Sequence, residues 1–147
     1  MFKKILVGVD GSKYSDRAVE TAIGLARQNE AAIFLLHVIR NLSLPKELLD
    51  MIAKGEVTES RMELLQDSAE IILDSAKKKC TQADLPNVTG EYLVGNPAST
   101  IAGYAEEHGV DLIVVGHHGI SSESPEILGG VVKKLTNISN ISCLIVK

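Results

Sequence analysis

The chain has 147 residues, which we interpret as one domain over residues 1–147 because domains of this size are common. Hydrophobic residues form 45% of the sequence, enough for a core, and the net charge is −4. A negative charge argues against nucleic acid or an anionic membrane surface as partner, since both favour a basic face. The first apolar run, residues 5–9, is too short for a signal peptide or a membrane span, and the two cysteines lie far apart in the sequence. We therefore expect a reduced cytoplasmic setting.

Apolar runs alternate with helical patterns along the whole chain. Runs typical of strands cover residues 3–10, 31–39, 88–94, 112–115 and 143–146. Helical spacing of apolar residues predicts helices over 13–29, 57–83, 97–108 and 131–138, with Ser12 and Asn96 as N-caps of the first and third. This alternation predicts an α/β fold, with right-handed crossovers and a parallel sheet covered by helices on both faces.

Three stretches allow finer predictions. Residues 88–94 alternate between apolar and polar, which indicates a strand at or near a sheet edge. Residues 112–115 form the most apolar run, which indicates a central strand. Residues 41–55 are the least regular, and a short helix is expected over 48–52.

A glycine-rich stretch follows the most apolar strand. Gly116 and Gly119 are followed, after nine residues, by Gly129 and Gly130, and a helix is expected from Val131. A strand, a glycine-rich loop and a helix N-terminus together favour binding of an anion, because the first N–H groups of a helix lack partners. Asp10, Val38 and Gly116 follow or end apolar strands, and ligands of parallel sheets lie outside the carboxyl ends of the strands. We therefore predict that this loop holds the phosphates of a nucleotide.

The spacing G-x2-G-x9-G-G resembles the universal stress protein family, whose nucleotide-binding members carry G-x2-G-x9-G-(S/T). The similarity extends over nearly the whole chain, through KILVGVDGS at 4–12, LHVI at 36–39, VGNP at 94–97, DLIVVG at 111–116 and LIVK at 144–147. The resemblance implies a doubly wound sheet of five parallel strands in the order 3-2-1-4-5. It also implies binding of ATP or AMP and a homodimer.

Carried over residue by residue, the resemblance implies contacts to the base, to the ribose and to the phosphates. Gly8, Val9, Val38 and Val115 would line the adenine; Asp10, Gly116, His118 and Gly119 would lie by the ribose and phosphates; Gly129, Gly130 and Val131 would offer N–H groups to the phosphates.

Two departures from the family pattern bear on affinity. Gly130 stands where the family has Ser or Thr, which removes a hydroxyl worth roughly 1 kcal/mol or somewhat more as a hydrogen-bond donor to a charged group. Residues 120–128 carry Glu123 and Glu126 and no cation, whereas family loops often carry Lys or Arg there. We expect triphosphate binding to be weak without a divalent metal, because like charges repel.

Several of these residues also allow simpler interpretations. Gly116 and Gly119 could only turn a tight loop, and Asp10 could only cap the first helix. His117 and His118 invite a metal site, but adjacent histidines in a loop are expected to point apart, and no third ligand has suitable spacing. His37 is interpreted as a core histidine with a satisfied hydrogen bond.

Three functions follow from these patterns. The first is a nucleotide-binding regulatory protein of the stress response, which acts as a homodimer through the last strand, residues 143–146, with an unidentified protein partner. The second is a protein-interaction module of the same fold that works without nucleotide. The third, an adenylate-forming or pyrophosphatase-type enzyme, would need a Ser/Gly-rich loop after the first strand, which is absent. We assign no catalytic residue and expect slow ATP hydrolysis at most.

Overall fold

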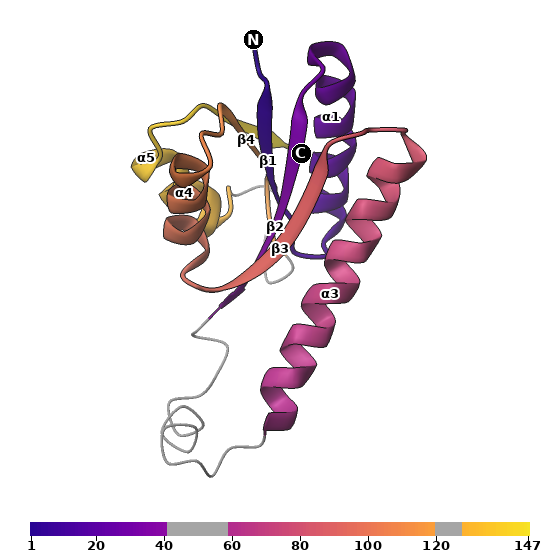
Figure 1. Cartoon of the computed structure of the whole chain (residues 1–147). Helices are drawn as coiled ribbons and strands as arrows, with labels where there is room; N and C mark the ends of the chain where they lie inside the picture. The colour runs from indigo at the N-terminus through magenta and orange to yellow at the C-terminus, as the bar shows by residue number, and fades with distance from the viewer. Residues whose placement is uncertain (41–58, 120–127) are drawn as a thin grey trace.

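The computed structural model describes residues 1–40, 59–119 and 128–147 (Figure 1). The short helix expected over 48–52 and the acidic residues Glu123 and Glu126 lie outside these ranges. Within them the chain alternates strand and helix: β1 (Lys4–Gly8), α1 (Lys13–Asn29), β2 (Ala32–Arg40), α3 (Glu59–Gln82), β3 (Val88–Gly95), α4 (Pro97–Glu107), β4 (Leu112–Gly116), α5 (Gly130–Ile138) and β5 (Cys143–Val146). The predicted elements are confirmed, with boundaries that differ by one or two residues.

The strands form one sheet in the order β3-β2-β1-β4-β5, and every pair is parallel. The order expected from the family resemblance is confirmed, as is the edge position of β3. The most apolar strand, β4, is buried throughout but is not central. The middle strand is β1, where Ile5 pairs with Ile33 on one side and with Leu112 on the other. A strand is apolar when both of its faces are buried, and this holds for every strand inside the sheet. Apolarity therefore does not identify the middle strand among equally buried neighbours.

Helices cover both faces of the sheet, with α1 and α3 on one face and α4 and α5 on the other (Figure 1). Each face has its own core, because successive side chains of a strand point to opposite faces. Ile5 and Val7 of β1 pack under α1 and α3, whereas Leu6 packs with the residues of α4 and α5. In the described ranges no helix combines the length and apolarity needed to cross a membrane.

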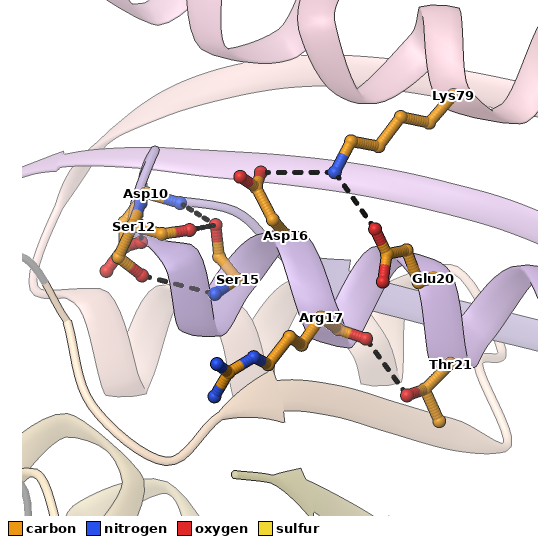
Figure 2. A network of polar contacts seen from close by, with 8 residues as sticks. All are labelled: Asp10, Ser12, Ser15, Asp16, Arg17, Glu20, Thr21 and Lys79. Carbon is orange, nitrogen blue, oxygen red and sulfur yellow. Dashed lines mark hydrogen bonds and ion pairs between the residues drawn. The ribbon is translucent and has the colours of Figure 1, made fainter.

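The predicted N-caps of α1 and α4 are confirmed. The Ser12 hydroxyl oxygen accepts a hydrogen bond from the Ser15 N–H, and the Asn96 side chain accepts one from the Ser99 N–H. Further along α1, Lys79 of α3 reaches the Asp16 and Glu20 carboxylates at 3.7 and 3.5 Å (Figure 2). These ion pairs tie the two helices of one face together, although exposed pairs contribute little to stability.

Candidate functional site

The carboxyl ends of β2, β1 and β4 lie side by side, because the three strands are neighbours and parallel. Val38 therefore lies at the same edge of the sheet as Asp10, which follows β1, and Gly119, which follows β4. Val38 and Val115 pack against the core between the sheet and α4 and α5, where Gly8 also lies. Three of the four residues predicted to line the adenine thus share one corner of the molecule. The fourth, Val9, buries its side chain in the other core, under α1 and α3.

Asp10 holds the turn into α1. Its Oδ1 accepts the Ser12 N–H at 2.9 Å, and its own N–H donates to the Ser15 hydroxyl oxygen at 3.3 Å (Figure 2). The cap of the helix itself is Ser12. The other carboxylate oxygen of Asp10 faces the glycine loop, since a Cβ added to Gly119 would lie 2.8 Å from it. Asp10 therefore supports the turn and also borders the loop, and Ser15 is a part of this network that the sequence pattern did not single out.

Gly116 lacks a side chain because α1 packs directly on it. A Cβ at this position would lie 2.7 Å from the Tyr14 carbonyl carbon and 2.9 Å from its oxygen. Gly8 is also close to its neighbours, with 3.2 Å between a Cβ and Val115 Cγ1. Gly116 is therefore required by a contact with the main chain of α1, whether or not a ligand is bound, whereas a Cβ at Gly8 would need only a small shift of the Val115 side chain.

His117 and His118 pack against each other, contrary to the expectation that they point apart. Both are buried, their ring centroids are 4.2 Å apart, and the rings meet edge to face. The His118 ring also meets the Tyr14 ring edge-on at 5.3 Å. The close packing of α1 on Gly116 places Tyr14 beside the loop, where the His118 ring contacts both Tyr14 and His117. No group of three or more His, Cys, Asp or Glu side chains that could hold a metal occurs in the part of the chain that the structure describes.

The main chain of His117 joins β4 to two other elements. Its N–H donates to the Val146 carbonyl of β5 at 2.7 Å, and its carbonyl accepts the Gly129 N–H at 3.0 Å. Burial lowers the pKa of His117, and nearby His118 and Lys147 lower it further. The neutral imidazole is therefore the form that this junction favours.

The start of α5 offers fewer free N–H groups than expected. Gly129, at the N-cap, was predicted to give its N–H to a phosphate, but that N–H is bonded to the His117 carbonyl. Gly130 and Val131 follow in the first turn, where N–H groups have no acceptor inside the helix, and no side chain of the described residues caps this end. Gly130 is exposed, and a Cβ there would meet no atom within 4 Å. Two of the three predicted donors, Gly130 and Val131, thus have no partner among the described residues.

The model of the universal stress protein family matches residues 1–147 of this chain. The chain belongs to the universal stress protein family. The universal stress protein YxiE of Bacillus subtilis is 36% identical over 150 residues, and the alignment covers 100% of both chains. The solved structure of MJ0577 from Methanocaldococcus jannaschii, also named a universal stress protein, has a TM-score of 0.82 at 29% identity and covers 100% of this chain and 96% of that one.

Two more distant universal stress protein structures contain a nucleotide. One is a complex with cAMP, with a TM-score of 0.68, 24% identity, and 99% and 96% of the two chains covered. The other, from Archaeoglobus fulgidus, is a complex with dAMP, with a TM-score of 0.70, 17% identity, and 100% and 98% covered. At these identities the likeness concerns the fold.

Proposed function

We propose that this universal stress protein binds an adenine nucleotide, ATP or AMP, at the carboxyl edge of β2, β1 and β4, and acts as a homodimeric, cytoplasmic regulator of the stress response. One observation carries the proposal. Asp10, Gly119 and the first turn of α5, which has no capping side chain among the described residues, come from three separate parts of the sequence and lie around one edge of the sheet. Unpaired N–H groups at a helix start favour an anion, and the helix dipole adds to their effect.

Each part of the site would contact one part of the nucleotide. The base would lie against Gly8 and Val115, with its polar edge on the main chain of Val38. Val9 would contribute only its main chain, because its side chain packs in the other core. The ribose and first phosphate would lie between Asp10 and the main chain of His118 and Gly119. Further phosphates would accept the N–H groups of Gly130 and Val131, and magnesium would offset the charge of Glu123 and Glu126.

The complexes of cAMP and dAMP support the proposal at the level of the fold. They contain adenine nucleotides bound by proteins of the same architecture. Their identities of 24% and 17% carry no residue of their sites over to this chain. The choice between ATP and AMP therefore depends on this chain's own loop.

A second function, a protein-interaction module that works without nucleotide, is favoured by two features. Gly130 supplies no hydroxyl to a phosphate, and residues 120–128 contain two carboxylates and no cation. Both features weaken binding of a triphosphate in particular. AMP, with fewer charges, would be affected least.

Direct measurement separates the two functions. The freshly purified protein is denatured, and released small molecules are identified by mass spectrometry. AMP and ATP are then titrated by calorimetry, with and without magnesium. We expect an adenine nucleotide to be bound, with ATP binding strengthened by magnesium. A protein that releases nothing and binds neither nucleotide would support the interaction module instead, and tight metal-free ATP binding would refute the role given to the acidic loop.

A pair of glycine variants tests where the nucleotide lies. Gly119→Ala places a methyl group 2.8 Å from Asp10 Oδ2, so the carboxylate or the loop must shift and the space beside them is reduced. Gly103→Ala, in α4, meets nothing within 4 Å and serves as the control. We expect nucleotide affinity to fall about tenfold or more in the first variant and to be unchanged in the second. Equal affinity in both would remove the loop from the site.

A further inference from the structure

His37 makes an unusual hydrogen bond at the carboxyl end of β2. Its Nδ1 lies 2.7 Å from the carbonyl oxygen of Val9, the residue that follows β1. A carbonyl oxygen only accepts hydrogen bonds, so Nδ1 must carry the hydrogen. The interpretation of His37 as a core histidine with a satisfied bond is confirmed for the bond, whereas the side chain is only partly buried and belongs to neither core. The identity of the bonding partner gives the contact a further meaning.

The bond takes the place of a rung in the sheet. The last backbone bond between the two strands runs from the Val9 N–H to the Leu36 carbonyl at 2.9 Å. In a parallel sheet alternate residues bond to the same neighbour, so the next rung would join the Val38 N–H to the Val9 carbonyl. No such bond occurs among the described residues. The Val9 carbonyl is bonded to the His37 imidazole instead.

Because the imidazole bonds the Val9 carbonyl, the main chain of Val38 makes no backbone hydrogen bond to Val9 at this edge. Its N–H and C=O point toward the side that β1 has left, and neither has a backbone partner there in the described residues. A neighbouring donor and acceptor match the acceptor and amine on the polar edge of an adenine. Asp10 follows Val9 directly, so the same bond also fixes the point from which its carboxylate extends.

We propose that His37 is a positioning residue of the nucleotide site. By bonding the Val9 carbonyl at 2.7 Å it competes with the Val38 N–H for that acceptor, and so keeps the main chain of Val38 available to the base. This inference rests on the proposed function for its ligand, but the open rung is a property of the protein alone.

Hydrogen exchange on the ligand-free protein tests the open rung. His37→Leu removes the donor, which leaves the Val9 carbonyl free to accept the Val38 N–H. We expect the Val38 amide to exchange about tenfold or more slowly in His37→Leu than in the wild type, because a new rung protects it. His37→Asn keeps an N–H donor near the position of Nδ1 and should exchange like the wild type. Unchanged exchange in His37→Leu, or slowed exchange in His37→Asn, would overturn the proposal.

Calorimetry with AMP tests the consequence for binding. We expect about tenfold weaker binding in His37→Leu and recovery to within about threefold in His37→Asn. The control is His108→Leu, since Nδ1 of His108 also bonds a carbonyl, that of Tyr104, but within α4 and away from this edge. If His37→Asn binds AMP as weakly as His37→Leu, the role of His37 is packing alone. A wild type that binds no adenine nucleotide would refute the proposed function, while the exchange result would still decide whether His37 holds the rung open.

Discussion

The four glycines of the predicted phosphate loop differ in the space around them. An added Cβ would meet the main chain of Tyr14 at Gly116, the Asp10 carboxylate at Gly119 and the His117 carbonyl at Gly129, each at 3.1 Å or less. At Gly130 it would meet nothing within 4 Å. Gly116 is therefore fixed by the main chain of α1, and Gly119 and Gly129 have close neighbours that a side chain would displace. Gly130 has room for the hydroxyl-bearing side chain of the family pattern.

Restoring that hydroxyl should strengthen nucleotide binding. Gly130→Ser adds a donor in the first turn of α5, where a phosphate is expected, and affinity should rise by up to about tenfold, the effect of one charge-assisted hydrogen bond. Gly130→Ala adds the same Cβ without the hydroxyl and controls for changes in the helix. Calorimetry with AMP and ATP provides the measurement. If Ser and Ala variants bind equally, no phosphate lies at this turn.

His117 makes the stability of the protein sensitive to acid. Because burial, His118 and Lys147 lower its pKa below the ordinary value of 6.5, the unfolded chain takes up a proton before the folded one as the pH falls. The contribution of His117 to stability is fully present above pH 6.5, and it is lost as the pH falls from 6.5 toward the lowered pKa of the folded state. We expect the urea midpoint of the wild type to fall more than that of His117→Gln between about pH 7.5 and about pH 5.5. Parallel behaviour of the two proteins would contradict this expectation.

At the scale of an element, the first turn of α1 links the stability of a helix to the shape of the site. The Ser12 side chain is 8% exposed and bonds the Ser15 N–H at 3.1 Å, while the Ser15 hydroxyl bonds back to Asp10 and to the Ser12 carbonyl. The turn is thus closed by short polar side chains from both sides (Figure 2). Loss of the cap would leave a buried N–H without its acceptor, which is costly.

We expect Ser12→Ala to lower the free energy of unfolding by about 1 kcal/mol, and by no more than about 2 kcal/mol. Ser12→Asn keeps an acceptor at the N-cap and should recover most of this loss. Urea unfolding followed by circular dichroism measures both. An alanine variant as stable as the wild type would mean that water replaces the cap.

At the scale of the whole molecule, the sheet ends in two edge strands, β3 and β5. The carbonyl of Ser142, just before β5, accepts the Ile113 N–H of β4, and the carbonyl of Val146 accepts the N–H of His117, which follows β4. The N–H and C=O groups of Cys143 and Ile145 therefore point to the open side. Unpaired groups on an edge strand favour pairing with another strand. A second copy of β5, paired antiparallel, would satisfy both edges, as a two-fold symmetric contact requires.

We therefore expect a homodimer through Cys143–Val146 that Ile145→Pro converts to a monomer, because proline removes an outward N–H. Ile145→Ala loses the same contacts with the core but keeps the N–H, and it should remain a dimer. Sedimentation equilibrium at micromolar concentration distinguishes the species. A monomeric wild type would refute the dimer, and a dimeric proline variant would place the interface elsewhere.

The sequence alone determined the elements, the caps and the architecture. Hydrophobic periodicity and cap chemistry are local, so strands, helices and the roles of Ser12 and Asn96 could be predicted within one or two residues. The strict alternation of elements required a parallel sheet. The glycine spacing and the matching stretches pointed to the family and, through it, to the strand order.

Only the tertiary structure decided how the candidate site is built. Tyr14 packs on Gly116, and Asp10 borders Gly119, across about a hundred residues of sequence. His117 holds the N–H of Gly129, and the imidazole of His37 holds the carbonyl of Val9. Each contact joins segments that the sheet order brings together. A local sequence pattern does not predict which atoms of a distant segment it will contact. The sequence therefore predicted which residues gather at this edge, while the distances between them decided which groups remain free for a ligand.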